Sequence, residues 1–79
     1  MEVFKAMPNN LRKIREKQKL SQLALGRKTG IAGNIISNLE NGKIFPYAGW
    51  RKKLAAALNV SEAELFPREV AENEVSTGV

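Results

Sequence analysis

Apolar residues recur at helical spacing along most of the chain. Trp50, Leu54 and Leu58 are four residues apart, and Leu11 and Ile14 share one face of an earlier segment. No segment alternates apolar and polar residues with the period of two that is typical of strands. The pattern predicts an all-α fold. The first expected helix is capped by Asn9 or Asn10 and runs to about Lys17. The next three run from Gln22 to about Thr29, from Ala32 to Asn41, and from Tyr47 to Leu58. A short fifth helix, capped by Ser61, ends near Phe66.

Several residues at the ends of these segments favour the same boundaries. Ser21 is a good N-cap, and Ser61 with Glu64 fits a capping box. Gly30 and the pair Asn41-Gly42 stand where helices would end. Gly26 lies inside its helix, and its missing side chain indicates a close crossing by the helix that follows.

Composition divides the chain into three parts. Residues 1–8 form an arm that ends at Pro8, residues 9–66 form one domain, and residues 67–79 form an acidic, polar tail that we expect to be flexible. No apolar run approaches the length of about 18 residues that a membrane span needs, and the first residues are too weakly apolar for a signal peptide. We therefore expect a cytoplasmic protein that does not enter a membrane.

Three missing residue types narrow the function. The chain has no cysteine, no histidine and no aspartate, so disulfides and most metal or acid–base sites cannot be built. We expect no enzymatic activity, no metal and no cofactor. A chain of 79 residues is also only marginally stable alone, which makes a homodimer plausible.

The charge distribution indicates an anionic partner. The net charge is +5 and the isoelectric point is about 9.9. Residues 1–66 hold twelve of the 13 basic side chains and only five of the eight acidic ones, so the expected domain is more basic than the whole chain. A pI above about 9 is the electrostatic signature of a nucleic-acid binder. A charge of this size also serves solubility alone.

Two short helices separated by a glycine-containing turn at Gly30 are the signature of a helix-turn-helix. Residues from about Asn10 to Phe66 resemble the Cro and phage-repressor type of this motif, the Xre family, whose fold is a compact, lambda-repressor-like bundle of five helices. The matching segments are Leu11-Arg-Lys-Ile-Arg15, Leu20-Ser-Gln-Leu-Ala24, Gly30-Ile31, Ile36-Ser-Asn-Leu-Glu-Asn-Gly-Lys43, Pro46, Leu54-Ala-Ala-Ala-Leu-Asn-Val-Ser61 and Glu64-Leu-Phe66.

The resemblance implies that the helix over residues 32–41 lies in the DNA major groove. The implied base contacts are Gly33, Asn34, Ser37 and Asn38. An asparagine amide can pair with the adenine edge, whereas the alternative is that these side chains are only solvated. Ile35 either contacts a thymine methyl or belongs to the core. Ala32 replaces the usual capping residue, and Gly33 removes a base-reading side chain.

The resemblance also implies supporting roles. The implied phosphate contacts are Gln22, Asn41 and Lys43, with Arg12 and Lys28 as weaker candidates. Arg15 and Glu40 would form a structural ion pair between two helices. The implied dimer interface comprises Phe45, Tyr47, Leu65 and Phe66. Arg51 departs from the family by standing at an inward aliphatic position, and we expect Trp50 to take over that packing.

The sequence thus predicts a transcription regulator, most simply a repressor, that binds double-stranded DNA sequence-specifically as a dimer. Two alternatives keep the fold and change the function. The first is an antitoxin that also binds a small protein partner, and the second is a protein-interaction module with weak DNA binding.

Overall fold

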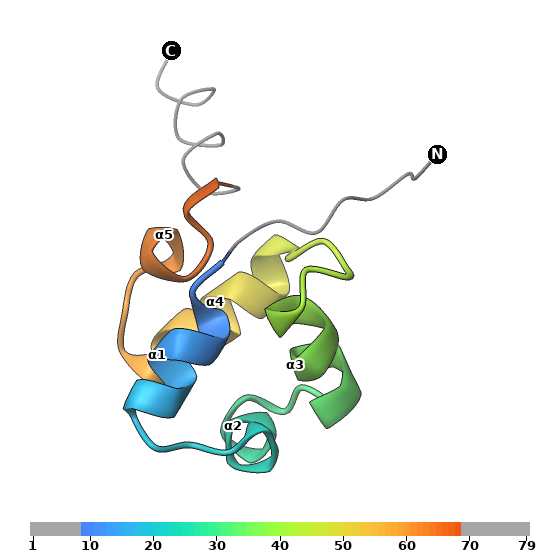
Figure 1. The fold of residues 1–79 in the computed structure, drawn as a ribbon, viewed down its shortest axis with the longest axis vertical. Coiled ribbons are helices and arrows are strands. Elements are labelled where there is room, and N and C mark those ends of the chain that lie inside the picture. The colour runs from blue at the N-terminus through green and yellow to red at the C-terminus, as the bar shows by residue number, and fades with distance from the viewer. Residues whose placement is uncertain (1–8, 69–79) are drawn as a thin grey trace.

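The computed structural model describes residues 9–68, and within this range every regular element is a helix (Figure 1). The elements are α1 (Leu11–Lys17), α2 (Gln22–Thr29), α3 (Gly33–Glu40), α4 (Ala48–Leu58) and α5 (Glu62–Leu65). The predicted all-α fold with five helices is confirmed. The arm predicted over residues 1–8, and residues 69–79 of the predicted tail, lie outside the described residues.

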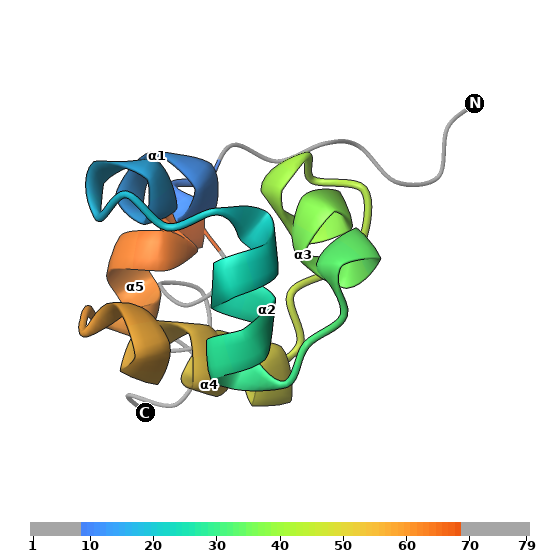
Figure 2. The ribbon, with the colours of Figure 1, turned by 90° about the horizontal axis from the view of Figure 1, so that it is seen from below.

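The helices form one bundle around a single core. α2 contacts both α3 and α4, α5 packs on α4, and α3 also touches α1. Seen from below, α2 stands between α3 on one side and α5 on the other (Figure 2). Every helix contributes to the core, whose largest fully buried side chains are Leu11, Leu25, Ile36, Leu39, Leu54, Leu58, Leu65 and Phe66. None of the helices in this part of the chain is long and apolar enough to cross a membrane.

The turn between α2 and α3 depends on two glycines. Gly30 ends α2 with a φ of +78°, a conformation that glycine adopts without steric cost. A Cβ atom on Gly26 would lie 2.8 Å from the carbonyl oxygen of Ile31 and 3.6 Å from Cδ1 of Ile36. Gly26 therefore permits a close approach, as expected, but the tightest contact is with the turn backbone and only the second is with α3.

Helix boundaries differ from the predicted ones by one residue at three places. Ala32 and Asn41 are the caps of α3 rather than its first and last residues, and Tyr47 is the N-cap of α4. Ala32 makes no side-chain capping bond. The end of α3 is well closed, because Gly42 has a φ of +69° and the amide of Lys43 donates to the carbonyl of Asn38 at 2.8 Å.

Polar side chains begin the other helices. Ser21 accepts from the amide of Ala24 at 2.9 Å, and Ser61 with Glu64 forms the predicted capping box. At α1 the residue in the N-cap position is Asn10, yet the side chain that accepts from the helix is that of Asn9. Asn9 also donates to the carbonyl of Leu39 at 2.9 Å, which ties the start of α1 to α3.

Candidate nucleic-acid interface

The outer face of α3 is polar and uncharged. Gly33 and Asn34 are exposed, and Ser37 and Asn38 are half-buried. Asn34 and Asn38 are one helical turn apart and share this face, while Ile36 and Leu39 on the opposite face are buried. The predicted base-contacting residues therefore occupy one continuous strip of α3. Ile35 is half-buried and packs against the core, which favours the core alternative for it.

The chemistry of this strip suits base edges. Within residues 9–68 the side chains of Asn34 and Asn38 take no part in the hydrogen bonds that join side chains to the rest of the protein. Each amide therefore keeps one acceptor and two donor hydrogens for another molecule. A Cβ on Gly33 would meet nothing within 4 Å, so the first turn of α3 is open to close approach.

Exposed cations lie on segments next to α3. Lys43 stands three residues after Glu40, the last residue of α3, and Arg12 lies on α1 beside the end of α3, where its Nη2 is 3.5 Å from the Asn41 side chain. Lys28 instead borders a hollow between α2 and α4 together with Lys53. The structure therefore brings Arg12 and Asn41 together at the end of α3, with Lys43 two residues further along the chain, but places Lys28 elsewhere.

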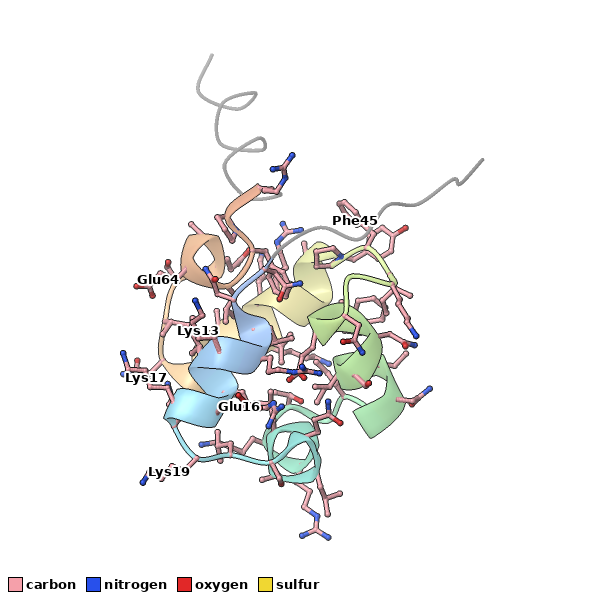
Figure 3. All side chains as sticks on the ribbon, in the orientation of Figure 1. Lys13, Glu16, Lys17, Lys19, Phe45 and Glu64 are labelled. Carbon is pink, nitrogen blue, oxygen red and sulfur yellow. The ribbon has the colours of Figure 1, made fainter. Side chains whose placement is uncertain are left out.

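The two lysines of α1 and a third lysine, two residues after that helix, form a separate group. Lys13, Lys17 and Lys19 are exposed and extend away from α3 in the view of Figure 3. They do not join the strip on α3.

The single carboxylate of α3 is covered and surrounded by donors. Arg15 donates to both carboxylate oxygens of Glu40, with Nη2 at 3.2 Å from Oε1. Gln22 donates to Oε1 at 3.0 Å and Arg12 to the same oxygen at 3.4 Å. The Glu40 side chain has a relative exposure of 0%. A charge that would repel DNA phosphates is thus compensated from two other helices.

This surrounding sets the ionisation of the pair. Burial alone would raise the pKa of the Glu40 carboxyl group, but the bonds donated by Arg15, Gln22 and Arg12, together with the positive charge of Arg15, outweigh burial and hold that pKa below its usual value. The bond to Glu40 in turn raises the pKa of Arg15. Both groups are therefore charged at neutral pH.

From the sequence we predict one partner for the Glu40 carboxylate, Arg15, whereas the structure shows three donors to it. Gln22 and Arg12 were predicted as phosphate contacts only. They are 18 and 28 residues from Glu40 in the chain, so no local spacing signals either contact.

The loop between α3 and α4 exposes two aromatic side chains. Phe45 is 43% exposed and Tyr47 62% exposed, and their ring centroids lie 4.9 Å apart in an edge-to-face arrangement. Phe45 projects at the outer end of the loop (Figure 3). Ile44 and Trp50 are half-buried against the core.

The other two predicted interface residues are corrected by the structure. Leu65 and Phe66 are at most 1% exposed, because the single-turn α5 directs its apolar end into the core. Both side chains are covered by the fold, so only Phe45 and Tyr47 remain exposed candidates.

Arg51 is a second buried arginine, and its polar contacts are not predicted by the sequence. Arg51 on α4 is 7% exposed, donates to the carbonyl of Pro46 at 2.7 Å, and pairs with Glu62 of α5 at 3.1 Å. The guanidinium, rather than Trp50 alone, therefore occupies the inward position. It joins the aromatic loop to α5.

Comparisons with known proteins agree with this geometry. A family model described as a helix-turn-helix domain matches residues 9–69. A search of curated proteins found no match. The crystal structure of the restriction-modification controller protein C.AhdI from Aeromonas hydrophila is similar, with 32% sequence identity and a TM-score of 0.68. The match covers 72% of this chain and 86% of that chain.

Proposed function

Since this chain belongs to the family of helix-turn-helix domains, which bind DNA to regulate transcription, we propose that it represses transcription as a dimer bound sequence-specifically to double-stranded DNA. The resemblance to the Cro and phage-repressor type is confirmed by the family match. One observation carries the proposal. The outer face of α3 offers neutral amide groups while its only carboxylate is covered and exposed cations lie at its end. This arrangement suits a helix lying in the major groove.

Within that proposal the residues divide into two roles. Gly33, Asn34, Ser37 and Asn38 face the bases. Gln22, Asn41, Lys43 and Arg12 contact phosphates, with Lys28 the least supported because of its place beside α4. Base contacts specify the sequence, whereas phosphate contacts fix the position of the protein on the duplex.

The base contacts are tested by selecting bound duplexes from a random DNA pool. We expect a palindromic consensus with half-sites about 10 bp apart. Asn34→Ala or Asn38→Ala should weaken binding to the consensus by about 5-fold to 100-fold and relax selection at particular bases. If both variants bind every duplex as the parent protein does, these asparagines are ordinary surface residues.

The phosphate contacts are tested by a matched pair of lysine variants. Lys43→Ala should weaken binding to all sequences alike and reduce the slope of log affinity against log salt by about one. Lys13→Ala removes the same charge from the face of α1 that points away from α3 and should leave that slope unchanged. Equal effects of the two variants would show that only the net charge matters.

The dimer is proposed to form through Phe45 and Tyr47. Sedimentation of the parent protein at micromolar concentration should show a dimer, and Tyr47→Ser should shift it toward monomer. A protein that remains monomeric both free and on DNA would contradict this part of the proposal.

The similarity to the controller protein supports a proposal about which genes are regulated. At 32% identity, we propose that the regulated genes belong to a restriction-modification system, and the selected consensus should then occur upstream of such genes. Co-purification of a small protein partner would instead favour the antitoxin alternative, and a pool without any consensus would favour the protein-interaction module. In each case the protein binds rather than catalyses. The cytoplasmic location stays a prediction.

A further inference from the structure

Three donors from two helices meet at one oxygen atom on a third helix. Oε1 of Glu40 accepts from Nη2 of Arg15, Nε2 of Gln22 and Nε of Arg12, at 3.2, 3.0 and 3.4 Å. Arg15 and Arg12 come from α1, and Gln22 is the first residue of α2. Such convergence exceeds what a structural ion pair between Arg15 and Glu40 requires.

The three donors differ in how many N–H groups remain available to another molecule. Arg15 is covered, and its Nη1 is already used on the carbonyl of Leu20 at 2.7 Å. Arg12 is 55% exposed and Gln22 is half-buried. A glutamine amide has two N–H donors and a guanidinium has five. Gln22 therefore keeps one N–H, and Arg12 keeps three after its bonds to Glu40 and Asn41.

The geometry points to Glu40 as a positioning residue for DNA binding: its Oε1 holds the side chains of Gln22 and Arg12 so that their remaining N–H groups meet phosphates as one preformed unit. This inference rests on the proposed function. Fixing two flexible donors before DNA arrives removes part of the ordering entropy that binding would otherwise lose. The unit also remains attractive to phosphate, because two guanidinium groups surround a single carboxylate.

The unit extends to the end of α3. Nη2 of Arg12 lies 3.5 Å from Oδ1 of Asn41, which leaves the amide hydrogens of Asn41 as donors. Three of the five proposed phosphate contacts are thus connected, directly or through Arg12, to the same carboxylate. Lys43 is absent from these side-chain bonds within residues 9–68 and serves as an independent contact for comparison.

The sign of one substitution separates positioning from simple electrostatics. Glu40→Gln removes a negative charge close to the proposed phosphate sites. If Glu40 acted only through its charge, this variant would bind DNA more tightly. If Glu40 positions Gln22 and Arg12, the folded variant binds more weakly despite its extra net positive charge.

The experiment measures affinity for the selected duplex with Glu40→Gln, Gln22→Ala and the double variant, at a temperature where circular dichroism shows each one folded. We expect losses of about tenfold for Glu40→Gln and about fivefold for Gln22→Ala. The double variant should bind no more weakly than Glu40→Gln alone, because an unheld Gln22 contributes little. Leu58→Ala is the control, since it weakens the core without touching this cluster and should keep full affinity while folded.

Other outcomes would overturn the inference. Tighter binding by Glu40→Gln, losses that multiply in the double variant, or an equal loss in folded Leu58→Ala would each do so. A parent protein that selects no duplex at all would overturn the proposed function as well, which distinguishes the two failures.

A second measurement covers the case in which Glu40→Gln does not fold. The inference requires Glu40 to hold the Gln22 side chain before DNA arrives, so the side-chain amide of Gln22 should be ordered in the free parent protein, as measured by NMR relaxation. Asn34 is the comparison, because its exposed side chain makes no hydrogen bond to the protein within residues 9–68. A Gln22 amide as mobile as that of Asn34 would overturn the inference.

Discussion

Two arginines of this small domain occupy similar positions with different surroundings. Arg15 and Arg51 are each 7% exposed, and each donates at 2.7 Å to a backbone carbonyl five residues away, that of Leu20 or of Pro46. Each also pairs with a glutamate. The glutamates differ, because Glu40 has a relative side-chain exposure of 0% and Glu62 one of 27%.

The difference shows that burial of the cation does not by itself determine what an ion pair contributes. A covered Glu40 carboxylate without its partner would lack hydration, whereas the partly exposed Glu62 without its partner could be hydrated. The first pair lies beside the candidate DNA-binding face and the second joins the aromatic loop to α5. The following variants test this contrast in order of decreasing expected effect.

The largest loss is expected for Arg15→Met. It leaves the covered Glu40 carboxylate without its main partner, which typically costs about 3–5 kcal/mol. Total stability of a domain this size is only about 4–12 kcal/mol, so this variant should be close to unfolding at 37 °C. Urea denaturation followed by circular dichroism gives the free energy of unfolding.

The partner variant makes this measurement specific to the pair. Glu40→Leu should also destabilise, but Arg15→Met combined with Glu40→Leu should lose clearly less than the two single losses together. Strict additivity would mean that the two side chains do not interact energetically, in contradiction to their contacts.

A smaller loss is expected for Arg51→Met. The methionine stem refills much of the apolar space, while the carbonyl of Pro46 loses its donor and Glu62 turns to water. We expect a cost of about 1–3 kcal/mol, measured by the same denaturation. Glu62→Gln should cost less than about 1 kcal/mol because that partner is partly solvated. A loss for Arg51→Met as large as that for Arg15→Met would remove the distinction between the two pairs.

The same two arginines show what the sequence could predict. Helical periodicity and capping residues are local signals, and they located five helices to within about one residue. The Arg15–Glu40 pair was inferred only from family resemblance, since its partners are 25 residues apart in the chain. Arg51 was noticed as a departure, but its contacts were not foreseen, because they depend on how the loop before α4 folds back over that helix.

In the candidate site, too, features set by local spacing can be predicted from the sequence, whereas contacts between residues far apart in the chain cannot. Exposure of Asn34 and burial of Ile36 follow from helical periodicity. The convergence of Gln22 and Arg12 on Glu40 follows from the crossing of three helices, which periodicity does not specify. Burial of Leu65 and Phe66 was missed for a related reason, because a single-turn helix has too few residues to define which face is inward.

The smallest effect expected is a pH dependence that belongs to Glu40. Its pKa is lower in the folded protein than in the unfolded chain, because donation from Arg15, Gln22 and Arg12 and the charge of Arg15 together outweigh burial. Its contribution to stability is therefore complete above the ordinary glutamate pKa of about 4.3 and is lost as pH falls through the folded value. Stability of the parent protein should fall with decreasing pH below about 4.3, and folded Glu40→Gln should lose part of that slope. The effect is smaller than either arginine substitution because protonation changes one hydrogen atom and leaves the packing in place.

Glu62→Gln is the matched control, because it removes a carboxylate from the other pair. An equal reduction of the pH dependence of stability by Glu62→Gln and by Glu40→Gln would contradict the assignment of that dependence to the ionisation of Glu40.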